Sequence, residues 1–279
     1  MHIILVNPLS NNGKTVNESI KLQKKLKKKN ITADIRSLLE IKEVEKFLDH
    51  YHEEDYIYIV GGDGTLHRIA NSIQGLEIRP KVFLYRSGTG NDFYRSLKQK
   101  GKLVDIKKYL FNLPKVKVNH NKAIYFLNGV GVGLDGMVCY EVNRLTKPKN
   151  RFNYMRLAFK SFIKSKKFEV DITIDGVNYN IPNAWFISVM NAPYFGGGMK
   201  VAPKAHRENK ELEIIIVKKV PKIILTLIFP TIYFGWHTIF KSFVKFYKGN
   251  HIKVTLKEGQ YMQVDGEDEY PVIEYEVKK

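Results

Sequence analysis

The sequence predicts two lobes, an α/β lobe over residues 1–115 and a mainly antiparallel, β-rich lobe over residues 116–279. Two observations predict this division. In the first part of the chain, apolar strand-like runs alternate with segments of helical periodicity, which is typical of a parallel sheet covered by helices. After about residue 115, short apolar runs follow one another with few helical segments between them. A chain of 279 residues is long enough to build two hydrophobic cores.

The first lobe begins with a strand and then alternates. Apolar runs predict strands over residues 3–6, 31–36, 56–60 and 81–85. Apolar residues at helical spacing predict helices over residues 14–29, 39–51 and 66–72. Each helix lies between two strands, which is the arrangement that a parallel sheet requires.

The second lobe combines strands with two helical interruptions. We expect strands over residues 123–132, 168–174, 184–189, 212–217 and 252–256, and helical segments from about 137 to 165 and from 221 to 247. No residue from Ile223 to Phe240 carries a formal charge, but Pro230 and Gly235 interrupt this run. The interruptions favour a buried or interfacial helical pair over a membrane span.

The charge balance limits the choice of partners. The chain has 46 Lys and Arg against 28 Asp and Glu, a net charge of +18, which attracts phosphorylated metabolites, anionic lipids or nucleic acid. No recognised nucleic-acid motif is present, so we do not expect nucleic acid as a partner. The single cysteine, Cys139, forms no internal disulfide, and the apolar start of the chain does not resemble a signal peptide. We therefore expect a cytoplasmic protein, and the sequence leaves a homodimer open.

The most informative segment runs from Tyr56 to Thr65, where an apolar strand ends in Gly61, Gly62, Asp63 and Gly64. Glycines at the carboxyl end of a parallel strand let the backbone close on a phosphate beside a helix N-terminus. An aspartate there is a suitable ligand, directly or through water, for the Mg²⁺ that accompanies a nucleotide. The alternative interpretation is a tight strand-to-helix turn in which Asp63 caps the helix.

Two further loops follow predicted strands. The first, Asn7 to Thr15, ends in Gly-Lys-Thr, but Pro8 stands where a Walker-type loop needs glycine, so Ser10 and Lys14 would act without that motif. By itself this loop could also be a capped helix start. The third loop, Arg86 to Phe93, contains two glycines and an aspartate. Parallel strands deliver all three loops to one edge of the sheet.

At this point the chain resembles the diacylglycerol kinase catalytic-domain family, whose bacterial members are soluble lipid kinases and whose relatives include sphingosine and ceramide kinases. The resemblance spans nearly the whole chain and rests on these segments: Asn7-Pro-x-Ser10, Gly61-Gly-Asp-Gly-Thr65, Gly88-Thr-Gly-Asn-Asp-Phe93, Asn128-x-x-Gly-x-Gly-x-Asp135, Asn191-x-x-x-x-Gly-Gly-Gly-Met199 and Asp265-Gly-Glu267. The Gly-Gly-Asp-Gly-Thr segment also resembles loops of NAD kinases and phosphofructokinases, so the third and last segments favour a lipid kinase.

The resemblance implies a nucleotide-binding α/β lobe, a C-terminal β-sandwich and an active site in the cleft between the lobes. It is also compatible with packing of the final segment of the chain against the first lobe. It implies that ATP phosphorylates the hydroxyl of a membrane lipid, first of all diacylglycerol, to give phosphatidic acid. Three groups of residues take implied roles: Asn7, Ser10, Asn11, Asn12, Gly13, Lys14, Ser37, Gly61, Gly62, Asp63, Gly64, Thr65 and Thr89 would bind ATP; Asp63 and Asp92 would bind Mg²⁺; and Glu267 would act as the catalytic base beside Asp265.

Two positions depart from the family pattern. Asn209 stands where an acid commonly binds a structural Mg²⁺, and the stretch from Lys115 to Asn119 lacks an aspartate that often belongs to the active-site water network. These departures keep two alternatives open, a kinase for a small soluble substrate such as NAD and a non-catalytic regulator that binds nucleotide or lipid. Without the family, the segment around Glu267 is also compatible with a plain hairpin turn bearing solvated acids.

A kinase that acts on a membrane lipid must contact the bilayer. The net charge of +18 and the apolar segment from Ile223 to Phe234 predict peripheral contact with an anionic membrane. Packing of that segment in the core is the alternative. The basic helix over residues 21–29 could assist such contact or simply be a solvated face.

Overall fold

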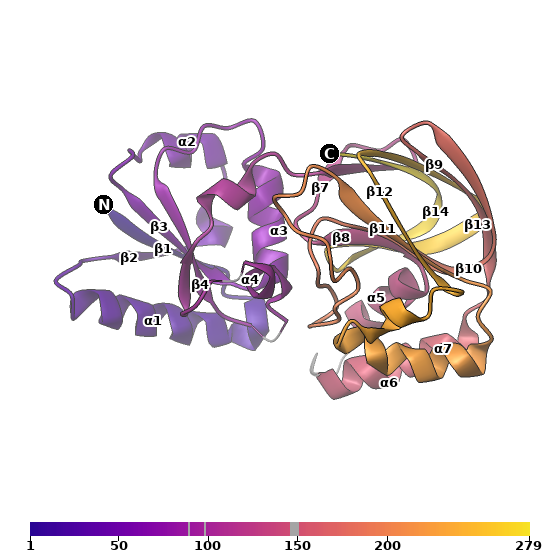
Figure 1. Ribbon diagram of the computed structural model, residues 1–279. Coiled ribbons are helices and arrows are strands. Elements are labelled where there is room, and N and C mark those ends of the chain that lie inside the picture. Colours follow the sequence, from indigo (N-terminus) through magenta and orange to yellow (C-terminus); the bar gives the residue numbers. More distant parts are fainter. Residues whose placement is uncertain (89, 98, 146–150) are drawn as a thin grey trace. The chain divides into compact units, whose positions relative to one another are not determined.

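The structure is a computed structural model that describes residues 1–88, 90–97, 99–145 and 151–279, without the side chains of residues 11, 12, 151–155 and 158 (Figure 1). The chain divides into two compact units, Met1–Asn112 and Leu113–Lys279. The first is the α/β lobe and the second the antiparallel β-rich lobe that the sequence predicts.

The first unit contains a five-stranded sheet in the order β2-β1-β3-β4-β5. Its strands are β1 (His2–Val6), β2 (Asp34–Ser37), β3 (Tyr56–Gly61), β4 (Lys81–Arg86) and β5 (Leu103–Asp105). Its helices are α1 (Lys14–Lys27), α2 (Val44–Asp49), α3 (Asp63–Ser72) and α4 (Asp92–Ser96), with short 3₁₀ turns η1 (Ser10–Gly13), η2 (Leu38–Glu40) and η3 (Lys107–Leu110). The first four strands are parallel, whereas β5 is antiparallel to β4 and was not predicted.

The sheet register places three loops at the same edge. Val6 at the end of β1 pairs with Val60 of β3, and Val60 pairs with Tyr85 of β4. Because these neighbouring strands are parallel, the loops after them begin side by side. Helix α1 supports this edge through Leu22 and Leu26, which lie one turn apart and are buried against the sheet.

Two predicted helices differ in extent. The helix expected from residue 66 already begins at Asp63, so Asp63, Gly64 and Thr65 form its first turn. The helix expected over 39–51 is divided into η2 and α2 by extended backbone at Ile41. In both cases the difference concerns where a helix begins or ends. Capping geometry, rather than apolar periodicity, determines these positions.

The second unit is a nine-stranded sheet in which every pairing between described strands is antiparallel. Its strands are β6 (Lys115–Val118), β7 (Ile124–Tyr125), β8 (Gly129–Gly133), β9 (Phe168–Ile174), β10 (Val177–Met190), β11 (Leu212–Lys218), β12 (Val244–Gly249), β13 (His251–Val264) and β14 (Glu267–Lys278). The long strands β10 and β13 each pair with β9 through one half and with β8 through the other. Because β10 and β13 each change partner along their length, the sheet curves and encloses one hydrophobic core.

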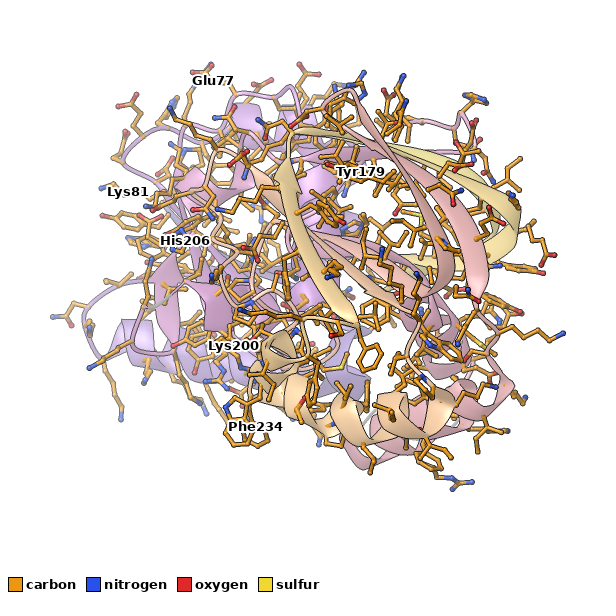
Figure 2. The ribbon with its side chains drawn as sticks, turned by 45° about the vertical axis from the view of Figure 1, so that its right-hand side comes forward. Glu77, Lys81, Tyr179, Lys200, His206 and Phe234 are labelled. Atoms are coloured by element: carbon orange, nitrogen blue, oxygen red, sulfur yellow. The ribbon has the colours of Figure 1, made fainter. Side chains whose placement is uncertain are left out.

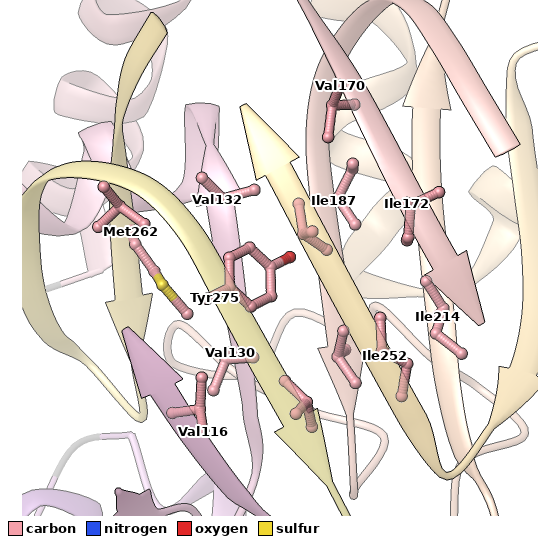
Figure 3. Close-up of a cluster of buried hydrophobic side chains, with 14 of the residues drawn as sticks. Val116, Val130, Val132, Val170, Ile172, Ile187, Ile214, Ile252, Met262 and Tyr275 are labelled. Carbon is pink, nitrogen blue, oxygen red and sulfur yellow. The ribbon is translucent and has the colours of Figure 1, made fainter. Parts of the chain in front are cut away.

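The core of this sandwich is almost entirely aliphatic (Figure 3). Alternate residues point inward, as Val170, Ile172 and Ile174 do on β9. The aromatic members of this cluster are Phe126, Phe168 and Tyr275. The Tyr275 hydroxyl is buried with them and has no hydrogen-bond partner among the described residues. Burial raises the pKa of this hydroxyl, and the nearby Asp135 adds to the effect.

Helical segments cover one side of the sandwich (Figure 1). They are α5 (Leu134–Asn143), α6 (Arg151–Lys164), α7 (Lys222–Ile228) and the 3₁₀ turns η4 (Phe229–Tyr233) and η5 (Trp236–Ile239). Pro230 in the first turn of η4 and Gly235, with φ +77°, divide the second helical interruption into short pieces. The interruption was predicted to reach residue 247, but it ends at Ile239, and strand β12 occupies residues 244–249. Within the described residues, no helix combines the length and the apolar character needed to cross a bilayer.

Candidate active site

The three predicted loops of the first unit contact one another at the sheet edge. The Ser10 hydroxyl of the first loop lies 2.9 Å from the Thr65 hydroxyl of the second. The backbone N–H of Ser87, which begins the third loop, donates to the carbonyl oxygen of Gly61 at 3.4 Å. Residues separated by more than 50 positions in sequence therefore share one polar edge.

Asp63 ties the second loop to the third. Its carboxylate accepts the backbone N–H groups of Asp92 at 3.0 Å and of Phe93 at 2.8 Å. These N–H groups begin α4 and have no partner within that helix. Asp63 is thus a helix cap, as one interpretation of the sequence proposed, but it caps the helix that follows the next strand rather than its own.

Glycines allow the second and third loops to approach each other closely. A Cβ atom on Gly62 would lie 3.3 Å from the carbonyl oxygen of Ser87. Gly88 adopts φ +129°, and a Cβ on it would lie 3.5 Å from Cα of Gly62. The Ser87 hydroxyl is buried here and has no hydrogen-bond partner among the described residues. Sequence reasoning did not single out this hydroxyl, although its place directly after β4 was a usable signal.

The first loop turns into α1 through Gly13, whose φ is +79°. The Thr15 hydroxyl donates to the carbonyl oxygen of Asn7 at 2.7 Å and closes the loop. Lys14 is exposed at the first position of α1. The predicted residues Asn11 and Asn12 lie in η1, with side chains outside the described part of the chain, and Thr89 lies outside the described residues altogether.

Ser37, another predicted ATP contact, ends β2 and pairs with Val6. Its hydroxyl accepts the backbone N–H of Leu39 at 3.2 Å and so caps η2. The structure therefore places Ser37 at the same edge of the sheet as the three loops.

The acids predicted to bind Mg²⁺ both take part in local hydrogen bonds. Asp92 is 4% exposed, and its Oδ1 accepts from the Arg95 guanidinium at 2.8 Å. No group of three or more Asp, Glu, His or Cys side chains suited to a metal occurs among the described residues. Mg²⁺ in nucleotide sites typically uses one or two carboxylates together with phosphates and water. The donor set of Asp63 and Asp92 fits a metal that arrives with a nucleotide, and does not fit an all-protein metal cage.

In the second unit, Asp265 and Gly266 form the two-residue turn between β13 and β14, with φ +49° and +93°. The Asp265 carboxylate accepts three consecutive backbone N–H groups, those of Leu127, Asn128 and Gly129. Asp265 is therefore not a solvated turn acid. It attaches the turn to the start of β8.

Side chains from α5 brace the other side of the same turn. The Asn143 amide donates to the carbonyl oxygen of Gly266 at 2.9 Å and to the Asp268 carboxylate at 2.8 Å. The Arg144 guanidinium donates to the other Asp268 oxygen at 2.8 Å. Glu267, the predicted base, lies between Gly266 and Asp268 and is exposed. Nothing in the local sequence around Asn143 indicated this role.

The motif residue Asn191 and two basic residues lie around the backbone that Asp265 holds. The Asn191 amide donates to the carbonyl oxygen of Leu127 at 3.1 Å, and Arg207 donates to the Asn128 side chain at 2.5 Å. Lys279 reaches the Asn191 side chain at 3.0 Å. Burial lowers the pKa of the Lys279 ammonium, and the nearby Arg207 lowers it further.

Asp135 is a half-buried acid that lines a cavity of this unit. Its carboxylate accepts from the Ser188 hydroxyl at 3.0 Å and from the backbone N–H of Gly136 at 2.9 Å. Burial raises its pKa from 3.8 to about 7, although these hydrogen bonds favour the charged form. A Cβ on Gly131 would overlap the same carboxylate, so the glycine in this motif makes room for the acid.

Asn209, the amide at the position of the family's metal-binding acid, stabilises a turn. Its backbone N–H donates to the carbonyl oxygen of His206 at 2.8 Å, and its side chain donates to that of Lys204 at 3.4 Å. Lys115 and Lys117, in the other departing stretch, are exposed on β6. Both departures are therefore accommodated within regular local structure.

Two family models match the chain. The diacylglycerol kinase catalytic domain matches residues 1–120, and the YegS C-terminal NAD kinase beta sandwich-like domain matches residues 128–275. These two matches correspond in order to the α/β unit and to the antiparallel unit.

Known relatives agree with these models. A Bacillus subtilis (strain 168) protein named putative lipid kinase YtlR is 30% identical over 230 residues, which cover 76% of this chain and 73% of that protein. A diacylglycerol kinase of the same organism is 25% identical and is matched over 77% of this chain and 72% of its own length. A crystal structure described as a putative diacylglycerol kinase from Bacillus anthracis str. Sterne aligns over 99% of this chain and 92% of that chain, with a TM-score of 0.67 and 22% identity. At this identity the alignment demonstrates the fold.

The half-buried Asp135 makes the stability of the second unit depend on pH. Because its pKa is raised from 3.8 to about 7 on folding, the native state binds more protons between these values, and its stability falls as pH rises through that range. Three pKa units correspond to about 4 kcal/mol. We expect the difference in unfolding free energy between the wild type and Asp135→Asn to fall by about this amount between about pH 4 and pH 8. Urea denaturation at several pH values measures it, and a difference independent of pH would contradict this account.

Proposed function

Because this chain belongs to the diacylglycerol kinase catalytic-domain family of lipid kinases, we propose that it transfers the γ-phosphoryl group of ATP to the hydroxyl of a membrane lipid. Diacylglycerol is the proposed acceptor and phosphatidic acid the product. The observation that carries the proposal is the link from Asp63 to the backbone of α4, because it joins two glycine-containing loops at the carboxyl edge of a parallel sheet.

An apolar cavity beside these loops supports nucleotide binding. It has a volume of about 240 Å³ and lies between the sheet and the segments η2, α2 and α3. Its lining is mostly aliphatic, but Asn7 and Thr65 also belong to it. We propose that the adenine ring enters this cavity while Ser10, Lys14 and the N–H groups at Gly62 hold the phosphates. Mg²⁺ bound with ATP would neutralise phosphate charge, with Asp63 and Asp92 as its protein partners.

The second unit supplies an apolar cavity and a candidate base. The cavity, of about 50 Å³, is lined by apolar side chains apart from Asp135 and His237, and we propose that it receives hydrocarbon of the lipid. We propose that Glu267 accepts the proton of the attacking lipid hydroxyl. Asp265 then acts as a positioning residue, since its carboxylate is hydrogen-bonded to the backbone of residues 127–129. We place this activity at the cytoplasmic face of the membrane, with the protein bound peripherally.

One assay tests the function. Purified protein is incubated with labelled ATP, Mg²⁺ and vesicles that contain diacylglycerol, ceramide, sphingosine or other lipid alcohols, and a parallel reaction contains NAD without lipid. Labelled phosphatidic acid is the expected product. Label in NAD alone would favour the small-molecule kinase, and binding of ATP without any labelled product would favour a regulator.

Glu267→Gln should retain ATP binding and lose turnover. The amide cannot accept the proton, and loss of a general base typically lowers kcat by about 10²–10⁴-fold. Lipid phosphorylation measures kcat, and calorimetry measures the ATP dissociation constant. Glu269→Gln, an exposed acid two residues further along β14, is the matched control and should keep wild-type turnover. Equal turnover in the two variants would remove Glu267 from the role of base.

Asn143→Ala should lower turnover by displacing the turn that carries Glu267. The variant loses the donors to Gly266 and Asp268, and we expect kcat to fall about tenfold, within the range seen for small displacements of catalytic groups. The KM for ATP should stay unchanged. Asn178→Ala, on the exposed β9–β10 hairpin, is the control. An unchanged kcat in Asn143→Ala would show that the turn keeps its geometry without this brace.

A further inference from the structure

The layer formed by α6, α7, η4 and η5 exposes large apolar side chains. On α7, Ile223 and Leu227 lie one turn apart and are 78% and 71% exposed. On α6, Phe159 and Ile163 are also exposed. The Lys222 ammonium donates to the carbonyl oxygen of Ile163 at 2.8 Å, so the two helices lie side by side (Figure 1). Their exposed side chains therefore belong to one layer of the second unit.

The apolar character continues beyond α7. Phe234 and Trp236 stack with ring centroids 4.9 Å apart and are 62% and 61% exposed, and Ile239 follows in η5. Phe234 lies at the outer edge of the helical layer (Figure 2). Exposed aromatic and aliphatic residues in a helical segment are typical of surfaces that enter the membrane interface. The docking surface is defined by Phe159, Ile163, Ile223, Leu227, Phe234, Trp236 and Ile239.

Core packing does not account for these side chains. The inner face of α7 is already provided by Leu225 and Ile228, which are buried and line the apolar cavity. The outer face then presents Ile223 and Leu227 to solvent. A helix that is apolar on both faces is suited to an apolar environment on each side, and an exposed apolar patch marks an interaction site.

The charge of the same layer is complementary to anionic lipid. From Ile214 to Gly249 the sequence has six lysines and no acid. Between Glu141 and Glu169 it has nine lysines and arginines and again no acid. These two acid-free stretches contain all the helical segments of the layer. Lysines beside an apolar surface attract it to negatively charged headgroups.

A lysine-lined cavity adjoins the docking surface. Its volume is about 730 Å³, and its lining includes Lys204, Lys241, Lys245 and Lys248. Thr238, which lies in η5 between the exposed Trp236 and Ile239, also lines it. One acid, Glu213, belongs to the lining but is itself only 3% exposed. The cavity is large enough for a phosphate-bearing headgroup, and four lysines belong to its lining.

We propose that the docking surface binds the surface of an anionic phospholipid bilayer. The apolar side chains enter the boundary between headgroups and hydrocarbon, while the lysines of the adjoining cavity contact headgroup phosphates. The inference extends the proposed function, on which its biological role rests, because it attaches the unit that carries Glu267 to the membrane that holds the lipid substrate.

Vesicle binding without nucleotide tests the apolar part. The chain has two tryptophans, of which Trp185 is buried and Trp236 exposed, so a blue shift of emission on addition of vesicles reports Trp236. We expect a blue shift and co-flotation with vesicles that contain phosphatidylglycerol. The double variant Ile223→Glu/Leu227→Glu should partition at least tenfold more weakly because two charges replace apolar groups in the interface. The matched control is Ile273→Glu, a similarly exposed isoleucine on β14.

Substitution of lysines tests the electrostatic part. Lys241→Gln/Lys245→Gln should weaken binding to anionic vesicles about 30-fold, since each basic residue near an anionic surface contributes about fivefold. Lys253→Gln/Lys257→Gln, which removes the same charge from β13, should have a smaller effect. Neutral phosphatidylcholine vesicles should bind all lysine variants equally weakly.

Each outcome is decisive. The proposal would be overturned by equal flotation of the wild type, Ile223→Glu/Leu227→Glu and Lys241→Gln/Lys245→Gln, with circular dichroism showing that all three are folded. A wild-type dimer that Ile223→Glu/Leu227→Glu converts to monomers, with vesicle binding unchanged, would assign the surface to a second copy and also overturn it. Phosphorylation of detergent-dispersed diacylglycerol without vesicle binding would reject the docking surface alone. Vesicle binding without lipid phosphorylation would instead reject the kinase function.

Discussion

An aspartate carboxylate that accepts backbone N–H groups from a distant loop holds each candidate site together. Asp63 binds the first two N–H groups of α4, and Asp265 binds three at the start of β8. Hydrogen bonds to a charged group contribute about 1.5–3 kcal/mol each, more than neutral ones. Both aspartates have a glycine neighbour, and Gly62 and Gly266 supply the close approach and the positive φ that these contacts require.

This structural role is compatible with chemistry at the same acids. A carboxylate has about four lone-pair sites, so accepting backbone N–H groups does not by itself prevent it from contacting water around a bound cation. The two interpretations of Asp63, cap and metal partner, therefore do not exclude each other. At Asp265 three N–H groups use most of the capacity, which leaves the neighbouring Glu267 as the better candidate for proton transfer.

The sequence predicted what depends on local pattern and parallel topology. Alternating periodicity was sufficient for the α/β lobe, and the meeting of three loops follows from β1, β3 and β4 being adjacent parallel strands. Long-range contacts gave no local signal. The support that Asn143 gives to Gly266 joins residues 123 positions apart, and the exchange of partners by β10 and β13 depends on the whole sandwich. Composition alone also could not separate buried from exposed residues in the uncharged run after Lys222, because both faces of α7 are apolar.

One short helix separates two apolar environments in the second unit. Helix α7 has seven residues, so it has little intrinsic stability and depends on the packing of Leu225 and Ile228 on its inner side. Those residues line the cavity proposed for hydrocarbon, and Ile223 and Leu227 on the outer side belong to the docking surface. A bilayer against the outer face would offer α7 apolar contacts in addition to those on its inner face. The same segment would then contact the membrane on one side and line the cavity on the other.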